Sequence, residues 1–252
     1  PNEKLTVSGN ISANGLLYGA VQAIKGTDNT AVGVNALCSI TTGQCNTAIG
    51  YQSLSGNTTG ERGTAIGVCA LYSNTVGNHN TATGYRSLFN NLSGSTNTAT
   101  GYESLYSNTT GTCNTASGYQ SLYSNTSSDY NTAIGFKSLY SITTGNVGLV
   151  VLAHNTANGF CSLYSNTTGH YNTSIGAYSL LSNTTGAQNT ANGFCSLYSN
   201  TTGSSNTASG MCSLRSNTTG SLNTASGYQS IRCNTTDYCN TATGYVTLYN
   251  NL

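Results

Sequence analysis

The chain has 252 residues, with seven Lys and Arg against six Asp and Glu, and its formal net charge is +1. So small a charge offers little attraction to nucleic acid or to an anionic membrane surface, and we expect neither partner. No stretch approaches the roughly 18 apolar residues of a membrane span, so we expect no membrane insertion. Any order in this weakly charged chain must therefore come from its sequence pattern.

Residues 1–28 stand outside the repeat that fills the remainder of the chain. Residues 5–17 alternate apolar and polar side chains around two Gly-containing turn signals, which is typical of short strands joined by turns. We predict an N-terminal β cap or the end of a preceding shaft. The chain opens Pro1-Asn2 without an initiator Met or a secretory signal, so we expect a fragment or a processed product.

A 17-residue unit occupies residues 29–252, which we predict to be one repeat domain. Copies begin at residues 29, 46, 63, 80, 97, 114, 131, 155, 172, 189, 206, 223 and 240, and the last is truncated. Position 2 of the unit is always Thr and position 5 is always Gly. Position 1 is Asn in all copies but one, as is Ala at position 3 and Leu at position 9. Self-similarity of this kind indicates a solenoid.

The length of the unit distinguishes a helical solenoid from a β-solenoid. Helical repeats run longer than about 30 residues, and this unit has no room for a paired helix. Two Gly-marked turns with Thr, Asn and β-branched residues between them favour two short strands per coil. The predicted fold is therefore all-β, a parallel β-solenoid (β-roll) of about thirteen 17-residue coils, stacked at about 4.8 Å through strand pairing.

Each position of the unit has an expected role. Gly at position 5 would supply a corner with positive φ, where a Cβ would clash. Ala at position 3 and Leu at position 9 should form the interior, and positions 7, 16 and 17, which vary freely, should be exposed. Asn at position 1 should stack into a hydrogen-bonded ladder that satisfies turn backbone, and Asn at position 12 should do the same at the opposite corner.

One irregularity interrupts the repeat at residues 146–154. The segment between the seventh and eighth copies is seven residues longer than the pattern allows. Its apolar run predicts a strand-like bulge lying on the rod or on a neighbour.

Two family likenesses follow from these residues. Residues 46–50 and 131–135, both Asn-Thr-Ala-Ile-Gly, resemble the strand of the head repeats of trimeric autotransporter adhesins, although those repeats are shorter. That resemblance implies a left-handed β-roll, three chains wide, that binds host surfaces. Residues 1–12 resemble a segment of phage and virus tail fibres, where similar Asn-Thr-Ala-x-Gly repeats occur. Both imply a homotrimer or a filament of such units.

Aromatic residues recur at two positions and should form two rows along the rod. The candidates are Tyr51, Tyr85, Tyr102 and Tyr119 at position 6, and Tyr72, Tyr106, Tyr123 and Tyr140 at position 10. One interpretation is a contact between chains, because a thin roll cannot cover so much apolar surface by itself. The other is a face that stacks on cell-surface glycans.

Asn-x-Thr/Ser sequons recur at position 12. The candidates for glycosylation are Asn57, Asn108, Asn166, Asn183, Asn200 and Asn217, although the spacing also follows from an Asn ladder at that corner. Nine Cys residues occupy different positions, so they form no regular disulfide framework. Cys195 and Cys212 share position 7 in adjacent coils, and their Cα atoms should lie about 4.8 Å apart, within disulfide reach.

Catalysis is not expected. The acids are scattered over different coils, and the three isolated His residues lack the spacing of metal ligands, so we expect no enzyme, metal or cofactor. The sequence predicts a structural and adhesive segment of a fibre that is extracellular, on a cell surface or part of a virion.

The alternative is a single-chain solenoid that binds carbohydrate or ice. Ice binding on a flat face needs Thr at i and i+2. Thr58 and Thr59 are adjacent instead, and each Thr of position 2 is flanked by Asn and Ala in most copies, which disfavours ice.

Overall fold

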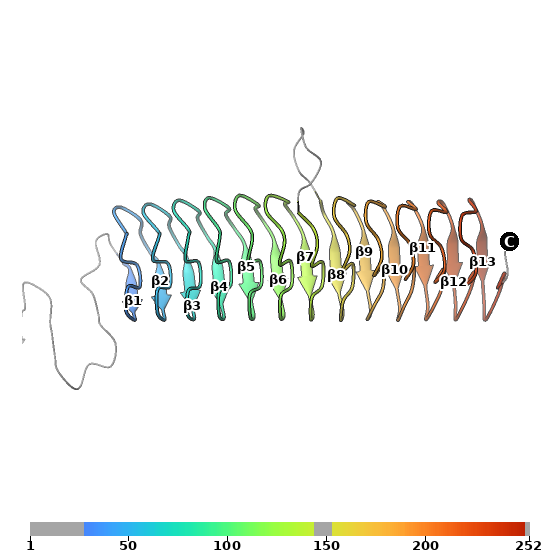
Figure 1. Ribbon diagram of the computed structural model, residues 1–252, viewed down its shortest axis with the longest axis horizontal. Helices are drawn as coiled ribbons and strands as arrows, with labels where there is room; N and C mark the ends of the chain where they lie inside the picture. Colours follow the sequence, from blue (N-terminus) through green and yellow to red (C-terminus); the bar gives the residue numbers. More distant parts are fainter. Residues whose placement is uncertain (1–27, 144–152, 250–252) are drawn as a thin grey trace, which may run out of the picture.

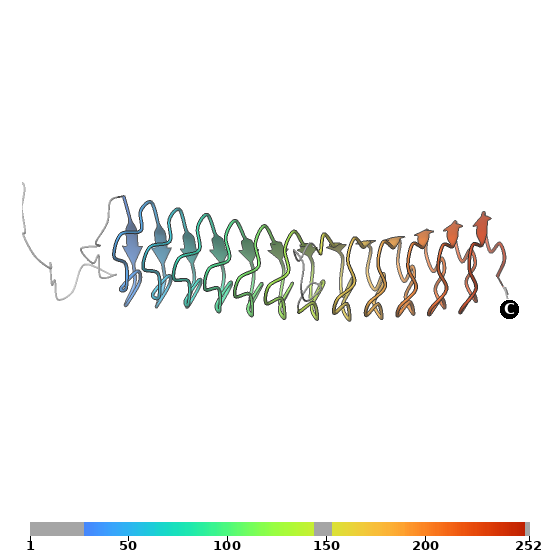
Figure 2. The same cartoon turned by 90° about the horizontal axis from the view of Figure 1, so that it is seen from above.

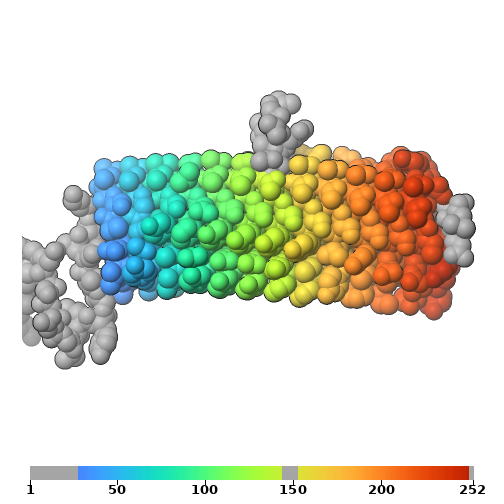
Figure 3. Space-filling model, viewed as in Figure 1, coloured from blue at the N-terminus to red at the C-terminus, as the bar shows by residue number. Residues whose placement is uncertain are grey.

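The computed structural model describes residues 28–143 and 153–249, which form a straight-sided rod (Figures 1 and 3). Each coil contributes one three-residue strand to a single sheet. The strands are β1 (Thr30–Val32), β2 (Thr47–Ile49), β3 (Thr64–Ile66), β4 (Thr81–Thr83), β5 (Thr98–Thr100), β6 (Thr115–Ser117), β7 (Thr132–Ile134), β8 (Thr156–Asn158), β9 (Thr173–Ile175), β10 (Thr190–Asn192), β11 (Thr207–Ser209), β12 (Thr224–Ser226) and β13 (Thr241–Thr243).

Sheet order follows chain order, and every pair of neighbours is parallel and in register. Thr98 pairs with Thr115 and Ala99 with Ala116, and the same partners recur from coil to coil. The prediction of an all-β parallel solenoid with 17-residue coils is therefore confirmed. Figure 2 shows the strand face turning gradually about the rod axis between β1 and β13, as the twist of strands requires.

The expectation of two strands per coil is wrong, because only positions 2–4 are extended. The remaining positions form turns, and non-Gly residues at positions 7 and 9 adopt left-handed backbone, as at Gln120 (φ 50°) and Leu122 (φ 51°). This half is nevertheless hydrogen-bonded from coil to coil: Leu105 N–H donates to Ser121 O at 3.0 Å and Thr109 N–H to Thr126 O at 2.8 Å. The ladder thus continues around the coil although the strand does not.

The core is closed within one chain. The Ala row of position 3 and the Leu row of position 9 are almost wholly buried, with Ala99, Leu105 and Leu122 at 0% exposure. Ser of position 8 is also buried, and its hydroxyl donates to the Gly carbonyl three residues earlier, as Ser213 Oγ does to Gly210 O at 2.9 Å. The predicted interior is confirmed, with a polar row added to it.

Gly at position 5 is required both by its positive φ and by the close approach of the next coil. All thirteen have φ between 118° and 144°, a region that L side chains rarely adopt. A Cβ on Gly101 would lie about 2.5 Å from the carbonyl oxygen of Gly118 in the next coil. The expected positive φ is confirmed, and the second cause is the close stacking of coils.

Both expected Asn ladders form, but they do not lie at opposite corners of the coil. At position 1, Asn97 Oδ1 accepts from the backbone N–H of Asn114 at 2.9 Å, and Asn97 Nδ2 donates to Gly111 O at 2.8 Å. At position 12, Asn108 Nδ2 donates both to Asn91 Oδ1 at 2.7 Å and to Gly111 O at 3.0 Å. One Gly carbonyl therefore receives an amide from each ladder, so the two ladders lie side by side.

Of the predicted insertion at residues 146–154, the structure describes only Ala153 and His154. The bulge predicted there, like the cap predicted for residues 1–28, falls largely outside the described residues. Ala153 and His154 take positions 16 and 17, because Tyr171 N–H donates to Ala153 O at 2.8 Å as the equivalent residues do in other coils. The position-1 ladder also continues across, with Asn155 N–H donating to Asn131 Oδ1 at 3.2 Å. The seven extra residues are therefore 146–152.

Candidate ligand-binding face

The rings of positions 6 and 10 stack into two parallel rows on one side of the rod. At position 10, rings stack without a break from Tyr72 to Tyr164, with centroids 5.0–5.3 Å apart. At position 6, the unbroken run extends from Tyr85 to Phe160. Each ring covers the faces of its neighbours, so what remains open to solvent is chiefly the ring edges, and Tyr102 is 43% exposed.

Seven of the eight predicted site tyrosines lie in these stacked runs, and Tyr51 lies at position 6 but is separated from its run by Val68 in the next coil. Of the position-6 residues, Tyr51, Tyr85, Tyr102 and Tyr119 are exposed; of the position-10 residues, Tyr72, Tyr106, Tyr123 and Tyr140 are half-buried. Burial raises the pKa of Tyr123, and the Glu103 carboxylate adds to the increase. Position 10 therefore lies deeper in this face than position 6, a difference that the spacing of the residues did not indicate.

Position 7 lies in the channel between the two rows, which corrects the expectation that it is exposed. Long side chains there fill the channel. The Arg86 guanidinium lies 5.1 Å from the Tyr85 ring centroid and 5.4 Å from that of Phe89. Lys137 bridges Phe136 and Tyr140 in the same way, at 5.6 and 5.3 Å. Of the positions expected to be exposed, position 17 is mostly so, and position 16 is mostly half-buried.

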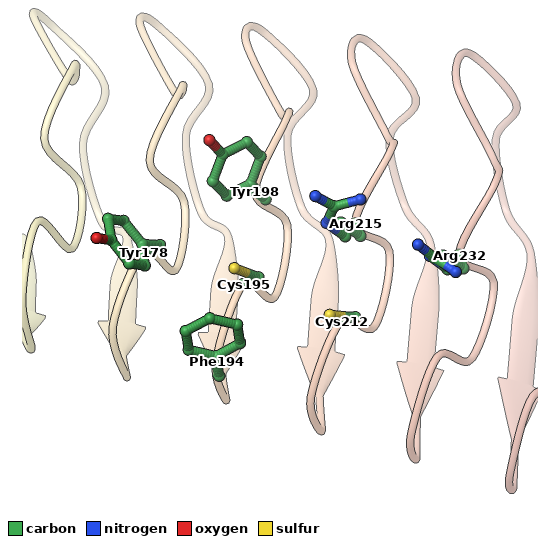
Figure 4. Close-up of a pocket in the computed structure, with 7 residues that line it drawn as sticks. All are labelled: Tyr178, Phe194, Cys195, Tyr198, Cys212, Arg215 and Arg232. Atoms are coloured by element: carbon green, nitrogen blue, oxygen red, sulfur yellow. The ribbon is translucent and has the colours of Figure 1, made fainter.

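Non-aromatic residues interrupt the two rows in the last five coils. Position 6 holds Ala177 and Met211 in two of these coils, and position 10 holds Leu181, Arg215 and Arg232 in three. A cavity of about 360 Å³ opens there (Figure 4). It is lined by Tyr178, Phe194, Cys195, Tyr198, Cys212, Arg215 and Arg232. Figure 4 shows Cys195 between Phe194 and Tyr198 on one coil, so the thiols occupy the level between the two rows.

Cys195 and Cys212 lie side by side on the floor of this cavity. Both thiols are free and buried, at 7% and 8% exposure. Burial raises the pKa of the Cys195 thiol, and Cys212 adds to the increase, while Arg215 opposes it. The Cys195 thiol is therefore neutral at ordinary pH, and the charged groups among the lining residues are the two arginines.

The six sequon residues are at the other corner, inside the position-12 ladder. Asn57, Asn108, Asn166, Asn183, Asn200 and Asn217 are each 0% exposed. The Nδ2 atom that a glycan would occupy donates hydrogen bonds instead, as Asn200 Nδ2 does to Asn183 Oδ1 at 2.8 Å and to Gly203 O at 2.9 Å. The folded coil has no space for a sugar at these atoms.

A third stacked row was missed by sequence reasoning. Tyr130, His154 and Tyr171 occupy position 17, with centroids 4.9 and 5.3 Å apart. The insertion concealed the row, because His154 takes its place in it only after residues 146–152 are set aside. It is short, and we assign it no binding role.

The outward face of the sheet carries a Thr row at position 2. Position 4 shares that face, because side chains alternate along a strand. The i and i+2 pair that ice binding needs therefore exists in the three strands where position 4 is Thr, namely β4, β5 and β13. In the other strands position 4 is Val, Ile, Ser or Asn. The face is thus a mixed one and not a regular Thr array.

No protein-family model, curated protein or solved structure matches this chain. Within residues 28–143 and 153–249, no group of three or more His, Cys, Asp and Glu side chains is placed to hold a metal ion. The same residues include no helix with the length and apolar character needed to span a bilayer. Fold and surface geometry are therefore the basis for a functional proposal.

Proposed function

We propose that this chain is a structural and adhesive segment of an extracellular or virion fibre, which offers a rigid, repetitive surface for attachment. The observation that carries the proposal is the combination of a core completed within each coil and aromatic rows left open along one side. Leu105 and Asn108 are fully buried, whereas Tyr102, three residues earlier than Leu105, is 43% exposed. The buried residues that make the coil rigid are thus distinct from the exposed residues that offer a contact surface.

Self-association is part of the proposal. The unbroken rings between Tyr85 and Phe160 present a continuous line of apolar edges, and a long apolar patch of this kind is typical of a contact between proteins. Closed symmetry is the usual way in which identical chains cover such a patch, and the likeness to adhesin heads favours three chains. We therefore propose a homotrimer in which the unbroken rows meet.

Solution mass tests this directly. Light scattering on the intact chain should give three times the chain mass, and electron microscopy should show rods. Replacing Tyr102 and Tyr119 together by Ser should lower the mass toward that of one chain. The control is Tyr130→Ser, because Tyr130 is equally exposed but lies at position 17, away from the rows. A monodisperse single chain at micromolar concentration contradicts the homotrimer.

The second candidate is the single-chain binder of carbohydrate or ice. The Thr row on the outward face of the sheet is the observation in its favour. A thermal-hysteresis measurement distinguishes it, since ice binding requires that face to retard crystal growth. The mixed residues at position 4 and the gradual turning of the strand face in Figure 2 lead us to expect no such activity.

A further inference from the structure

The cavity near the C-terminal end has a simple structural cause. In most preceding coils the channel between the aromatic rows is filled by long side chains such as Arg86, Gln120 and Lys137, and where position 7 is Cys there (Cys69 and Cys161) the adjacent coils carry longer residues. In the coils that begin at residues 189 and 206, position 7 is Cys. A Cys side chain ends at Sγ and cannot span the channel. The result is an opening of about 360 Å³, within the range of small-molecule sites (about 300–1,000 Å³).

The walls of the cavity carry two positive charges without a counter-charge. Arg215 and Arg232 occupy position 10 of adjacent coils, where like charges are held close by the stacking. None of the described residues that line the cavity is acidic. Asp237, the acid nearest to them in sequence, lies at the Asn-ladder corner, where its carbonyl accepts from Asn223 Nδ2 at 2.8 Å. An anion placed here would relieve the repulsion between the two guanidinium groups.

Each arginine stacks on an aromatic ring of position 10 in an adjacent coil. Arg215 lies over the ring of Tyr198, at 5.4 Å from its centroid, in the preceding coil. Arg232 lies over Tyr249 in the following coil, at 5.5 Å, and donates from Nη1 to the Tyr249 hydroxyl at 2.6 Å. Each guanidinium is thus held by an aromatic partner one coil away.

The remaining lining is aromatic. Phe194 packs edge-to-face with Tyr178, with centroids 6.0 Å apart and planes at 86°, which interrupts the parallel stacking of the rows. Ring faces otherwise covered by their neighbours become available at this break. Aromatic faces beside a cationic group suit a ligand that joins a flat or ring-shaped apolar surface to an anionic substituent.

We propose that this cavity binds an acidic sugar, whose carboxylate lies between Arg215 and Arg232 and whose ring stacks on the aromatic lining. The inference rests on the attachment role proposed above and specifies its ligand class. A nucleic acid is a poorer fit, because a chain of phosphates needs an extended basic patch, and the described coils carry their other cations singly. The size of the cavity suits one or two sugar units.

Titration with a galacturonate disaccharide, followed by ligand-observed NMR or calorimetry, tests the proposal. The disaccharide should bind saturably, and its neutral galactose counterpart at least about tenfold more weakly, since one charge-assisted hydrogen bond is worth about that factor. Arg215→Gln combined with Arg232→Gln should reduce galacturonate binding to the neutral level. Arg86→Gln, on the same face but outside the cavity, is the matched control and should leave binding unchanged.

A second variant tests the shape of the cavity independently of charge. Cys212→Gln should abolish binding of both sugars, because Gln at this position fills the channel. The backbone accepts it, since Gln52, Gln120 and Gln229 occupy the same position with the same left-handed φ. A thermal melt of each variant confirms that it is folded.

Three results would overturn the inference: no saturable galacturonate binding, binding that the double Arg variant leaves intact, or inorganic sulfate binding as tightly as galacturonate, which would make the cavity an ion site only. The fibre proposal fails separately, on the mass of the assembly. A trimer that does not bind galacturonate rejects only the ligand class.

Discussion

At the residue scale, the coil depends on backbone conformations that most side chains resist. Position 5 is Gly because both its φ and the next coil exclude a Cβ. Positions 7, 9 and 17 are left-handed without being Gly, and Leu105 is held there (φ 51°) while fully buried. Each such residue costs about 1–2 kcal/mol, which the packing of the Leu row must offset.

Gly101→Ala should therefore destabilise the rod by at least about 3 kcal/mol, from backbone strain and the contact with Gly118 O. Chemical unfolding measures the change. Gly63→Ala is the control, because Gly63 lacks the positive φ, Asn occupies the same position in all other coils, and a Cβ there would first meet the Asn46 side chain at 3.0 Å instead of backbone. A similar loss in both variants would mean that position 5 has no special requirement.

Thr96→Asn should stabilise the chain by about 0.5–1 kcal/mol. Thr96 is an exposed β-branched residue in the left-handed region (φ 60°), and Asn adopts that region more readily than Thr. Thr98→Asn is the matched control, since Thr98 is exposed but extended in β5, where Asn is disfavoured. The melting temperature of Thr98→Asn should fall. A rise in the melting temperature of both variants would disprove the backbone explanation.

Reactivity of the buried thiols should depend on pH. Because the pKa of Cys195 is raised by burial, it holds less thiolate than an ordinary Cys at pH 8, and alkylation there should be slow. At pH 8 the rate should be lower than for Cys113, which is exposed at position 17. Mass spectrometry follows alkylation at each residue. Equal alkylation rates for the two residues at pH 8 would contradict the buried environment of Cys195.

At the element scale, the stability of the coil depends on its ladders as much as on its strands. A three-residue strand supplies few hydrogen bonds, and the two Asn rows add others. Where Ile142 interrupts the position-12 ladder, Asn125 Oδ1 is left without a hydrogen-bond partner among the described residues. The ladder thus tolerates a gap at the expense of one unpaired acceptor.

Asn108→Asp should cost at least about 3 kcal/mol at neutral pH, because it buries a charge and removes the donor to Asn91 Oδ1 and Gly111 O. Burial should raise the pKa of the new carboxyl. The loss is therefore present above that pKa and diminishes as the pH falls below it, since protonation restores one donor. Melting curves between pH 7 and pH 3 measure this.

The control for that change is Asn78→Asp. Asn78 Oδ1 only accepts, from Glu61 N–H at 2.7 Å, and Asp129 already performs this role for Thr112 N–H at 2.6 Å. The control variant should remain within about 0.5 kcal/mol of the parent, as surface substitutions usually do. A large loss there, or none at Asn108, would show that the ladder is not the source of stability.

At the scale of the whole molecule, the rod is a one-dimensional array in which each coil contacts only its neighbours. The described strands pair solely with the strand before and the strand after. Stability in such an array is a sum of coil terms and nearest-neighbour terms, so the number of coils is adjustable but their register is not.

Deleting residues 97–113 removes one whole unit and joins position 17 to position 1. The shortened chain should fold, with the same circular dichroism per residue and a slightly lower melting temperature. Deleting residues 97–112 is the control, because it leaves one extra residue between position 17 of one coil and position 1 of the next. Either the rows shift at that junction or the extra residue must be expelled from the coil, and both should lower the melting temperature. Equal behaviour of the two deletions would mean that in-register stacking is not what holds the rod together.

The sequence by itself determined the class of fold, the coil length, the interior rows and the two ladders. It could do so because each of these depends on a residue returning at a fixed interval, and periodicity is visible without coordinates. Ala99 and Leu105 were assignable to the core, and Asn97 and Asn108 to the ladders, by this means alone.

Only the tertiary structure decided how the coil bends and what its bends bring together. Left-handed backbone at Leu and at variable residues has no composition signal, so one strand per coil could not be distinguished from two. That bend places position 7 between the aromatic rows, and hence Cys195 and Cys212 on the floor of a cavity beneath Arg215 and Arg232. The cavity arises because two adjacent coils carry Cys at position 7 in place of a longer side chain, while hydrogen bonding keeps the spacing between coils unchanged.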